Sequence, residues 1–274
     1  MPLVVTPRSG GVRPPLSIDL GGILPERLAG LTVSAAARLP ITADERPCRL
    51  GDLFDVRGDA ADGRLECVGD FSRVHRVAAG MNSGTVRIEG DVGRHAGEGM
   101  RGGRLQVSGS AGDWLAAEIA GGEVVVAGDA GHNAAAALPG SPRGGTGGVV
   151  LIGGKAGDLA AARLRRGVVA VAGGCGTGAG FEMLAGSLVV GGRLGGHAGL
   201  GLRRGSVIAL GDRPAPPATF RRGAAWRPAF LPLLLSWLVH AGFAPAAAAL
   251  RVPSWRQWHG DSLCGCRGEL LHPA

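Results

Sequence analysis

One glycine-based unit recurs eight times between residues 63 and 212, and this repeat limits the possible folds more than any other feature. The spacing between successive copies is 19 residues in five of seven cases. A second glycine follows six residues after the first in every copy. A fixed period of about twenty residues is typical of stacked repeats, in which each unit contacts only its neighbours. The copies begin at Gly63, Gly84, Gly103, Gly122, Gly148, Gly167, Gly186 and Gly205.

Each repeat contains the alternating pattern of a strand with one buried face. The second and fourth residues after the first glycine are apolar in all eight copies, as at Val86 and Ile88. The sixteenth is apolar in seven copies, including Ala79 and Leu138, so the return leg also points one side chain inward. Nineteen residues are too few for the strand, helix and loops of a leucine-rich repeat. The sequence predicts an all-β fold: a parallel β-helix (solenoid) of about eight coils with a 19-residue period.

The rest of the chain is predicted to cover the ends of this column, because open ends expose unpaired strand edges. We expect an N-terminal cap over residues 1–62, the repeats over 63–212, and a C-terminal cap and interaction tail over 213–274. The apolar stretch 230–243 contains Pro232 and is shorter than the ~20 residues that a membrane span needs. It predicts a short capping helix with an exposed or partner-facing apolar side, and no membrane insertion.

Composition narrows the function classes. The formal charge of +7 comes from arginine, with Lys155 as the only lysine. Such a charge favours acidic partners, but no aromatic platform or known motif accompanies it, so we expect no nucleic-acid binding. Five scattered cysteines, an odd number, are typical of a reducing cytoplasm, and residues 1–15 lack the apolar segment of a signal peptide.

No catalytic motif stands out, and we predict neither catalytic residues nor a metal site. His95 and His197 share the eleventh position of their repeats, and His132 is at the tenth. They belong to different repeats, which places them roughly 10 Å or more apart, too far for one zinc ion. Cys264 and Cys266 form a lone pair with one residue between them, without a second pair of ligands. Aspartates that follow a repeat glycine are expected to bond their own turns.

Five arginines share the last two positions of their repeats. Stacking aligns them as a broken ridge along one edge of the column. Solvated corner charges are the default interpretation of such a ridge. Because guanidinium groups bind carboxylates and phosphates, the alternative is a docking strip for an acidic subunit or a polyanionic cofactor tail. The fourth spacing, 26 residues, adds an insertion at 137–144 that predicts a one-sided loop. The ridge consists of Arg101, Arg165, Arg166, Arg203 and Arg204.

Several short segments, within the repeats and outside them, resemble one protein family. From about Leu50 to Glu269 the chain is similar to the C subunit of formylmethanofuran dehydrogenase and of its bacterial counterpart, the formyltransferase/hydrolase complex. The sequence departs from the family pattern where Ser72 and Cys266 replace glycines, and the second change leaves the local tail conformation open. The segments that carry the resemblance are 50–56, 90–93, 112–114, 137–140, 258–261 and 268–269.

This resemblance implies a scaffold subunit of one-carbon metabolism without its own active site or bound cofactor. In the archaeal-type enzyme a molybdenum or tungsten pterin is held by a neighbouring subunit, and an amidohydrolase subunit joins formate to methanofuran. In methylotrophic bacteria the complex passes a formyl group from a tetrahydromethanopterin carrier to a methanofuran-type carrier and releases formate. The implied partners are amidohydrolase-like, formyltransferase and dehydrogenase-like subunits in a hetero-oligomer. The glutamate tail of the furan carrier is then a candidate ligand for the arginine ridge.

Two alternatives remain beside the bacterial complex, which the arginine-, alanine- and glycine-rich composition favours. One is the C subunit of a molybdenum or tungsten formylmethanofuran dehydrogenase. The other is a subunit resembling the G-x-G-x-G domain of glutamate synthase, which has similar repeats but lacks the segments 50–56 and 258–269. Position 2 is Pro2 and not the cysteine that an amidotransferase needs. A polysaccharide-acting β-helix enzyme would carry a signal peptide and a carboxylate cluster.

Overall fold

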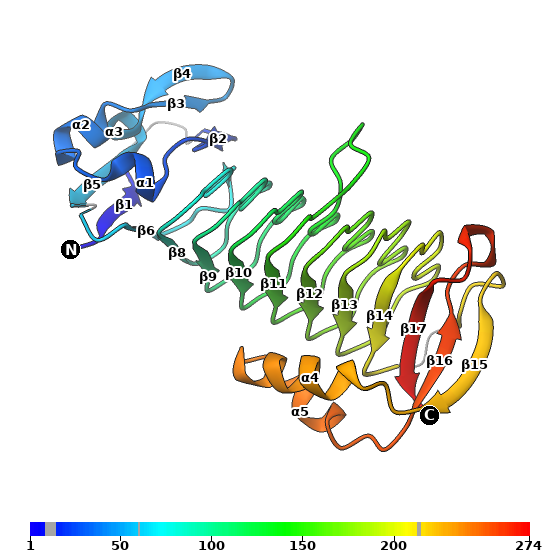
Figure 1. Cartoon of the computed structure of the whole chain (residues 1–274). Helices are drawn as coiled ribbons and strands as arrows, with labels where there is room; N and C mark the ends of the chain where they lie inside the picture. Colours follow the sequence, from blue (N-terminus) through cyan, green and yellow to red (C-terminus); the bar gives the residue numbers. More distant parts are fainter. Residues whose placement is uncertain (9–14, 60, 213–214) are drawn as a thin grey trace.

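The computed structural model describes residues 1–8, 15–59, 61–212 and 215–274, and this part of the chain consists mostly of β-strands. Thirteen strands form one long mixed sheet, in the order β15-β16-β17-β14-β13-β12-β11-β10-β9-β8-β6-β1-β5. A four-stranded sheet, β4-β3-β2-β7, lies near the N-terminus. The prediction of an all-β fold is confirmed. Figure 1 shows the repeats stacked along the molecule, with the two termini at opposite ends.

Every repeat contributes one strand to the long sheet, directly after its first glycine. Neighbouring strands are parallel and pair residues of equal offset, as in Arg104↔Glu123↔Val149 and Val168↔Ser187↔Ser206. A repeating offset therefore becomes a row of side chains across the sheet. The strands are β6 (Arg64–Val68), β8 (Thr85–Glu89), β9 (Arg104–Val107), β10 (Glu123–Val126), β11 (Val149–Ile152), β12 (Val168–Val171), β13 (Ser187–Val190) and β14 (Gly205–Ala209).

Two further rows of backbone contacts link the repeats. Single parallel bridges join equivalent residues from Phe71 through Val92 and onward to Leu194. On the return leg every second residue donates to a neighbouring repeat: His95 N to Asp113 O at 2.9 Å, and Gly97 N to Val77 O at 2.8 Å. Residues on this leg alternate into the left-handed region, including alanines such as Ala116 at φ 51°. L-residues rarely adopt this conformation. Glycine stands at the offset of Ala116 in three other repeats, at Gly97, Gly180 and Gly199, and all three also have positive φ.

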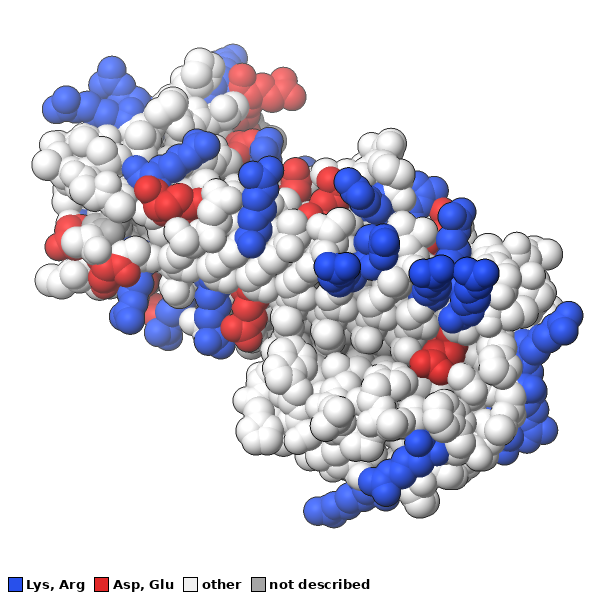
Figure 2. Space-filling model, viewed as in Figure 1, with Lys and Arg blue, Asp and Glu red and all other residues white. Residues whose placement is uncertain are grey.

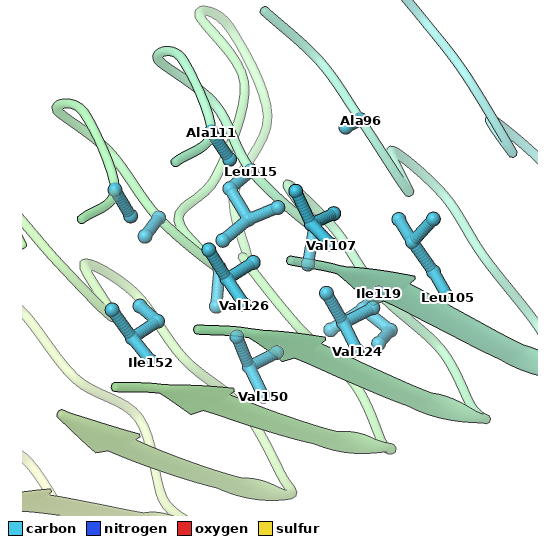
Figure 3. Close-up of a cluster of buried hydrophobic side chains, with 14 of the residues drawn as sticks. Ala96, Leu105, Val107, Ala111, Leu115, Ile119, Val124, Val126, Val150 and Ile152 are labelled. Carbon is cyan, nitrogen blue, oxygen red and sulfur yellow. The ribbon is translucent and has the colours of Figure 1, made fainter. Parts of the chain in front are cut away.

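The interior between these rows is filled by small and medium apolar side chains. Figure 3 shows Leu105, Val107, Val124 and Val126 pointing from their strands toward Leu115 and Ile119. All are almost fully buried. The predicted inward residue of the return leg is buried in most repeats, but Ala79 and Leu138 are only half-buried. The first repeat is two residues longer than most, and Met81 is buried there in place of Ala79. In the fourth repeat, Leu138 lies in the insertion.

The second glycine of the repeat allows successive backbones to approach closely. A Cβ atom added at Gly173 would lie 2.7 Å from the carbonyl oxygen of Gly154 in the previous repeat. Gly128 and Gly192 meet their preceding repeats in the same way. Contact between repeats therefore requires glycine at these positions, whereas at Gly69 and Gly90 a positive φ, 120° and 113°, favours it as well.

Side chains at the corners bind the next repeat. Asp70 accepts from Ser72 N in its own turn, as predicted, but Asp91 accepts from Ser110 N at 2.7 Å, one repeat further on. Asp129 similarly accepts from Lys155 N at 2.7 Å. The prediction that these aspartates bond their own turns is thus wrong for Asp91 and Asp129, because the next repeat brings a backbone N–H within reach.

The N-terminal segment adds the first rung of the long sheet. Strand β1 (Leu3–Pro7) runs parallel to β6 and antiparallel to β5 (Phe54–Gly58). Phe54 is buried and stacks on Phe71 with ring centroids 5.7 Å apart. The remaining elements of this segment are β2 (Ile18–Asp19), α1 (Pro25–Leu28), α2 (Val33–Ala37), β3 (Pro40–Ala43), β4 (Arg46–Arg49) and α3 (Leu50–Leu53). Strand β2 also pairs with β7 (Val74–His75) of the first repeat.

The C-terminal segment adds the last rung. Strand β17 (Gly268–Pro273) pairs parallel with β14, so that Gly268 lies beside Gly205. Strands β16 (Trp255–His259) and β15 (Arg221–Trp226) follow in antiparallel order, and β15 forms the edge of the sheet. A short 3-10 helix occupies Ser262–Cys264.

Two helices cover the outer face of the sheet beside this rung. Helix α4 (Phe230–His240) buries Leu231, Leu235 and Leu238 against outward-facing residues of β11–β14, and α5 (Pro245–Ala249) extends the contact. Those outward residues are Leu151, Ala170, Val189 and Ile208. The helix predicted for 230–243 therefore covers the side of the sheet, while strands continue past the last repeat (Figure 1).

Candidate functional site

The five arginines of the ridge fall into two aligned columns. The register Arg104↔Glu123↔Val149↔Val168 places Arg101 and Arg165 in one column, and Val168↔Ser187↔Ser206 adds Arg203. Arg166 and Arg204, one residue further on, share the second column. Backbone bonds hold the corner, with Arg165 N donating to Gly145 O at 2.8 Å and Arg203 N to Met183 O at 2.9 Å.

Only four of these arginines lie close together. Arg165 and Arg203 are two repeats apart, about 10 Å at the strand spacing, whereas Arg101 is three repeats from Arg165, about 14 Å. All five side chains are exposed. None of them forms an ion pair or side-chain hydrogen bond with another residue in the described part of the chain. Figure 2 shows Lys and Arg side chains gathered along the repeats.

This geometry suits binding of an anion, not bond-making chemistry. Guanidinium groups present several N–H donors in a plane and remain charged at any physiological pH. Four unpaired guanidinium groups spaced along two repeats match an extended chain of carboxylates or phosphates better than a single compact anion. The ridge includes no nucleophile or general base.

Two of the three corner histidines, His95 and His132, have separate side-chain partners. His95 Nδ1 lies 2.6 Å from Glu98 Oε2, and the His95 ring stacks on Trp114 with centroids 6.1 Å apart. His132 Nδ1 accepts from Asp158 N at 3.0 Å. Within the described ranges, no group of three or more His, Cys, Asp or Glu side chains is placed to hold a metal ion. These histidines serve contacts between and within repeats.

The cysteines divide into buried and accessible groups. Burial raises the pKa of Cys67 and of Cys175 to about 12, so both remain thiols at neutral pH. Cys264 and Cys266 are half-buried and unpaired. Cys266 has φ 55°, a left-handed conformation that favours glycine, which explains why glycine is expected at this position.

Two acidic residues in the segments that carry the family resemblance, Asp261 and Glu269, hold the C-terminal tail in place. Asp261 is buried and accepts from Gly201 N at 2.9 Å and from Leu263 N at 2.9 Å, which joins the tail to the seventh repeat. Glu269 accepts from Ser206 Oγ and from Gln257 Nε2, both at 2.7 Å. These two acids hold the final rung in place, and both are occupied by internal donors.

The insertion in the fourth repeat is fixed at its base. Leu138 N donates to Glu118 Oε1 at 3.1 Å, and Arg163 donates to the Ser141 carbonyl at 3.1 Å while its Nε lies 2.7 Å from Glu182 Oε2. The loop projects from the column between its neighbours (Figure 1). Its tip at Pro139 and Gly140 is exposed.

The uncovered part of the outer sheet face is polar. A shallow hollow of about 270 Å³ lies over Arg64, Arg87 and Arg104. Arg87 pairs with Glu89 at 3.6 Å, and Arg104 pairs with Glu123 at 3.3 Å. Carboxylates of this chain therefore balance two of the three arginine charges at the hollow. This polar face is not among the predicted sites, although the third residue after each repeat glycine indicates it by changing from polar to apolar at Val125.

Known proteins connect this architecture to one family. No protein-family model matches the chain. A chain in the X-ray structure of the formyltransferase/hydrolase complex FhcABCD from Methylorubrum extorquens, in complex with methylofuran, is 37% identical with a TM-score of 0.90, and the match covers 99% of both chains. The C subunit of the formyltransferase/hydrolase complex Fhc from M. extorquens is 39% identical over 80 residues, 29% of this chain and 30% of the relative.

A more distant relative is the C subunit of the tungsten-containing formylmethanofuran dehydrogenase 2 from Methanothermobacter thermautotrophicus. It is 27% identical over 99 residues, 35% of this chain and 36% of that protein. The curated relatives are thus matched over about a third of their length, whereas the solved chain is matched almost completely. The chain belongs to the family formed by the C subunit of the formyltransferase/hydrolase complex.

No helix in the described ranges is long and apolar enough to cross a membrane.

Proposed function

We propose that this protein is the scaffold subunit of a formyltransferase/hydrolase complex and has no active site of its own. The complex would pass a formyl group from a tetrahydromethanopterin carrier to a methanofuran-type carrier and release formate. The observation that carries this proposal is the end-to-end match, at 37% identity, to a chain of a complex solved with methylofuran. Amidohydrolase-like, formyltransferase and dehydrogenase-like subunits are the proposed partners.

The proposed architecture is a parallel β-helix closed by its own terminal segments. In-register strands, the row of single bridges and the bonded return leg supply three sides for each coil. We propose 1–62 and 213–274 as the caps, since β1 and β17 extend the column at its two ends. The unpaired state of all five cysteines supports a reducing compartment, the cytoplasm.

The arginine ridge is the proposed contact for an acidic carrier tail. Its support is the alignment of Arg165, Arg166, Arg203 and Arg204 on two nearby repeats without internal partners. A tail of successive carboxylates would engage several guanidinium groups at once, while its furan end remained free to reach the subunits that perform the chemistry. This chain would therefore bind the carrier but not react with it.

The alternative is the C subunit of a molybdenum or tungsten formylmethanofuran dehydrogenase, which the 27% identity to the M. thermautotrophicus protein favours less strongly. Native purification of the tagged chain, with identification of the co-eluting subunits and a metal assay, distinguishes the two. An amidohydrolase-like and a formyltransferase subunit without molybdenum or tungsten would support the hydrolytic complex. A stoichiometric molybdenum or tungsten pterin subunit would contradict it.

Charge reversal tests the ridge within the assembled complex. Replacing the four ridge arginines by glutamate should raise the KM for the carrier by at least about tenfold, since several charge-assisted bonds are lost. The control reverses Arg38, Arg46, Arg49 and Arg57, four exposed arginines of the N-terminal segment, with the same change in net charge. An unchanged KM in an intact complex would rule out the ridge. The reversed residues are Arg165, Arg166, Arg203 and Arg204.

A further inference from the structure

The outer face of α4 is an exposed apolar stripe. Phe230, Leu233 and Trp237 have spacings of three and four residues, which places them on one side of the helix, opposite the side packed on the sheet. Their exposed fractions are 38%, 74% and 43%. The helix contains no charged Asp, Glu, Lys or Arg. Figure 2 shows an area without charged side chains over α4 and α5.

Strand β15, which precedes α4 in the sequence, has an edge without a strand partner among the described residues. It pairs only with β16 and ends the long sheet, so its other edge has no strand partner in the described part of the chain. Five of its six residues are exposed, and Trp226 at its end is 44% exposed. An open strand edge next to exposed tryptophan is a hazard in an isolated protein and is typical of a surface that another chain covers.

The charge around these surfaces has one sign. Residues 215–274 contain six arginines and two acids. Both acids, Asp261 and Glu269, are already engaged by donors of this chain. The accessible charge is therefore positive and includes Arg221, Arg222 and Arg227 on and after β15. A second copy of this chain would bring arginine against arginine, which disfavours self-association.

From the stripe, the open edge and the one-signed charge, we propose that α4 and β15 form the docking surface for a different subunit. That subunit presents apolar side chains to Phe230, Leu233 and Trp237, and acidic side chains to Arg221 and Arg222. The contact is protein-based, because a helix that lies on an anionic membrane carries its Lys and Arg on its own polar face, and α4 has none. This inference rests on the proposed function, since it needs a hetero-oligomer.

Substitution of one exposed leucine tests the surface. The tagged full-length chain is expressed in its host as wild type, Leu233→Glu or Leu263→Glu, and the co-eluting subunits are quantified after native purification. Leu263 is 82% exposed and lies outside α4 and β15, so its variant introduces the same charge at a similarly exposed site. We expect Leu233→Glu to reduce recovery of at least one subunit by at least about tenfold, while Leu263→Glu matches wild type.

Further outcomes separate this inference from the proposed function. Full recovery of every subunit with Leu233→Glu would overturn the docking surface and leave the proposed function standing. A wild-type chain that elutes without other subunits would overturn both. A wild-type dimer of this chain that Leu233→Glu dissociates, or Leu233-dependent binding to vesicles of phosphatidylcholine with 30% phosphatidylglycerol, would replace the proposed partner and overturn the inference.

A second leucine variant and a double arginine variant complete the test. Leu233→Gln serves if the glutamate variant does not fold, because it removes the apolar side chain without adding charge, and the same loss of recovery is expected. Arg221→Glu with Arg222→Glu tests the acidic character of the partner. We expect this variant to retain fewer subunits than wild type at low salt and to lose the wild-type decrease in recovery as salt is raised, because salt screens an attraction in wild type and a repulsion in the variant. An unchanged salt dependence would contradict an acidic partner.

Discussion

The first and second halves of the repeat column share one backbone pattern but are stabilised differently. From β6 to β9 the outward side chains are polar, such as Arg87 and Gln106, and face solvent. From β12 to β14 the same offset carries Ala170, Val189 and Ile208, which are fully buried under α4 and α5. One face of one sheet is therefore open at one end and covered at the other.

Side-chain acceptors at the corners add a second difference along the column. His75, Asp113, His132 and Asp158, in the first, third, fourth and fifth repeats, each accept a backbone N–H from the following repeat, at 2.7 to 3.0 Å. The equivalent residue of the seventh repeat is Gly196, which has no side-chain acceptor. The first and third repeats thus have an acceptor without a covering helix, the fifth has both, and the seventh has the helix alone.

A charge placed under the helix should have the largest effect. Val189→Asp buries an unpaired carboxylate against α4, and we expect a loss of about 3 kcal/mol or more in the free energy of unfolding. The control is Gln106→Asp at the equivalent offset of the open half, which should change the stability by less than about 0.5 kcal/mol. Denaturant unfolding followed by circular dichroism measures both. Equal effects would mean that the two halves do not differ in cover.

An added methyl group tests whether the open half is stacked as tightly as the covered half. A Cβ atom at Gly102 would clash with the Asn82 carbonyl oxygen of the preceding repeat. Gly102→Ala should therefore destabilise the protein by about 1–3 kcal/mol. Gly196, where an added Cβ meets nothing within 4 Å, supplies the control. Thermal unfolding measures the stability of both variants. If Gly102→Ala left the stability unchanged, the open half would be loosely stacked.

A pH titration tests the corner acceptors. Burial, with the nearby charge of Arg94, lowers the pKa of His75, which accepts from Arg94 N. The unfolded chain then binds a proton more readily than the folded one. The contribution of His75 is complete above the unfolded pKa of about 6.5 and is lost as the pH falls below it.

The variant His75→Asn keeps an acceptor and removes the titration. We expect its melting temperature to fall less than that of wild type between pH 7.5 and pH 5.5. The reverse substitution at an equivalent site, Asp113→His, should add a similar dependence on pH. If wild type and His75→Asn lose the same stability over this range, the contact of His75 with the second repeat does not depend on pH.

Thiol labelling compares the halves without altering their stability. At pH 8 we expect Cys264 and Cys266 to react first with a disulfide reagent, since Cys67 and Cys175 have pKa values of about 12 and are buried. Of the buried pair, Cys175 should be labelled last, because the helices hold its half. Peptide mass spectrometry over time identifies the order, and earlier labelling of Cys175 would contradict the stabilising role of the cover.

The repeat pattern predicted the strands and the alignment of the arginines, because equal offsets in a stacked chain must lie above one another. It also contained the change to apolar residues at Val125, Leu151 and Ala170, which indicates a covered outer face. The left-handed return leg was predictable only in part. Gly97, Gly180 and Gly199 indicate it at the offset of Ala116 and Ala161, whereas the alanines themselves give no local signal of positive φ. A hydrogen bond from the N–H of each alanine to the preceding repeat holds it in a conformation that it would not adopt alone.

The sequence alone determined the period, the inward residues and the edge on which the five arginines lie, since each follows from local spacing. The tertiary structure decided that β1 and β17 extend the parallel strands of the repeats at their two ends and that α4 lies on the outer face of the sheet. These placements join segments far apart in the chain, and no local spacing encodes them. They follow from the pairing of free strand edges and the burial of two apolar faces, which arise only once the column has formed.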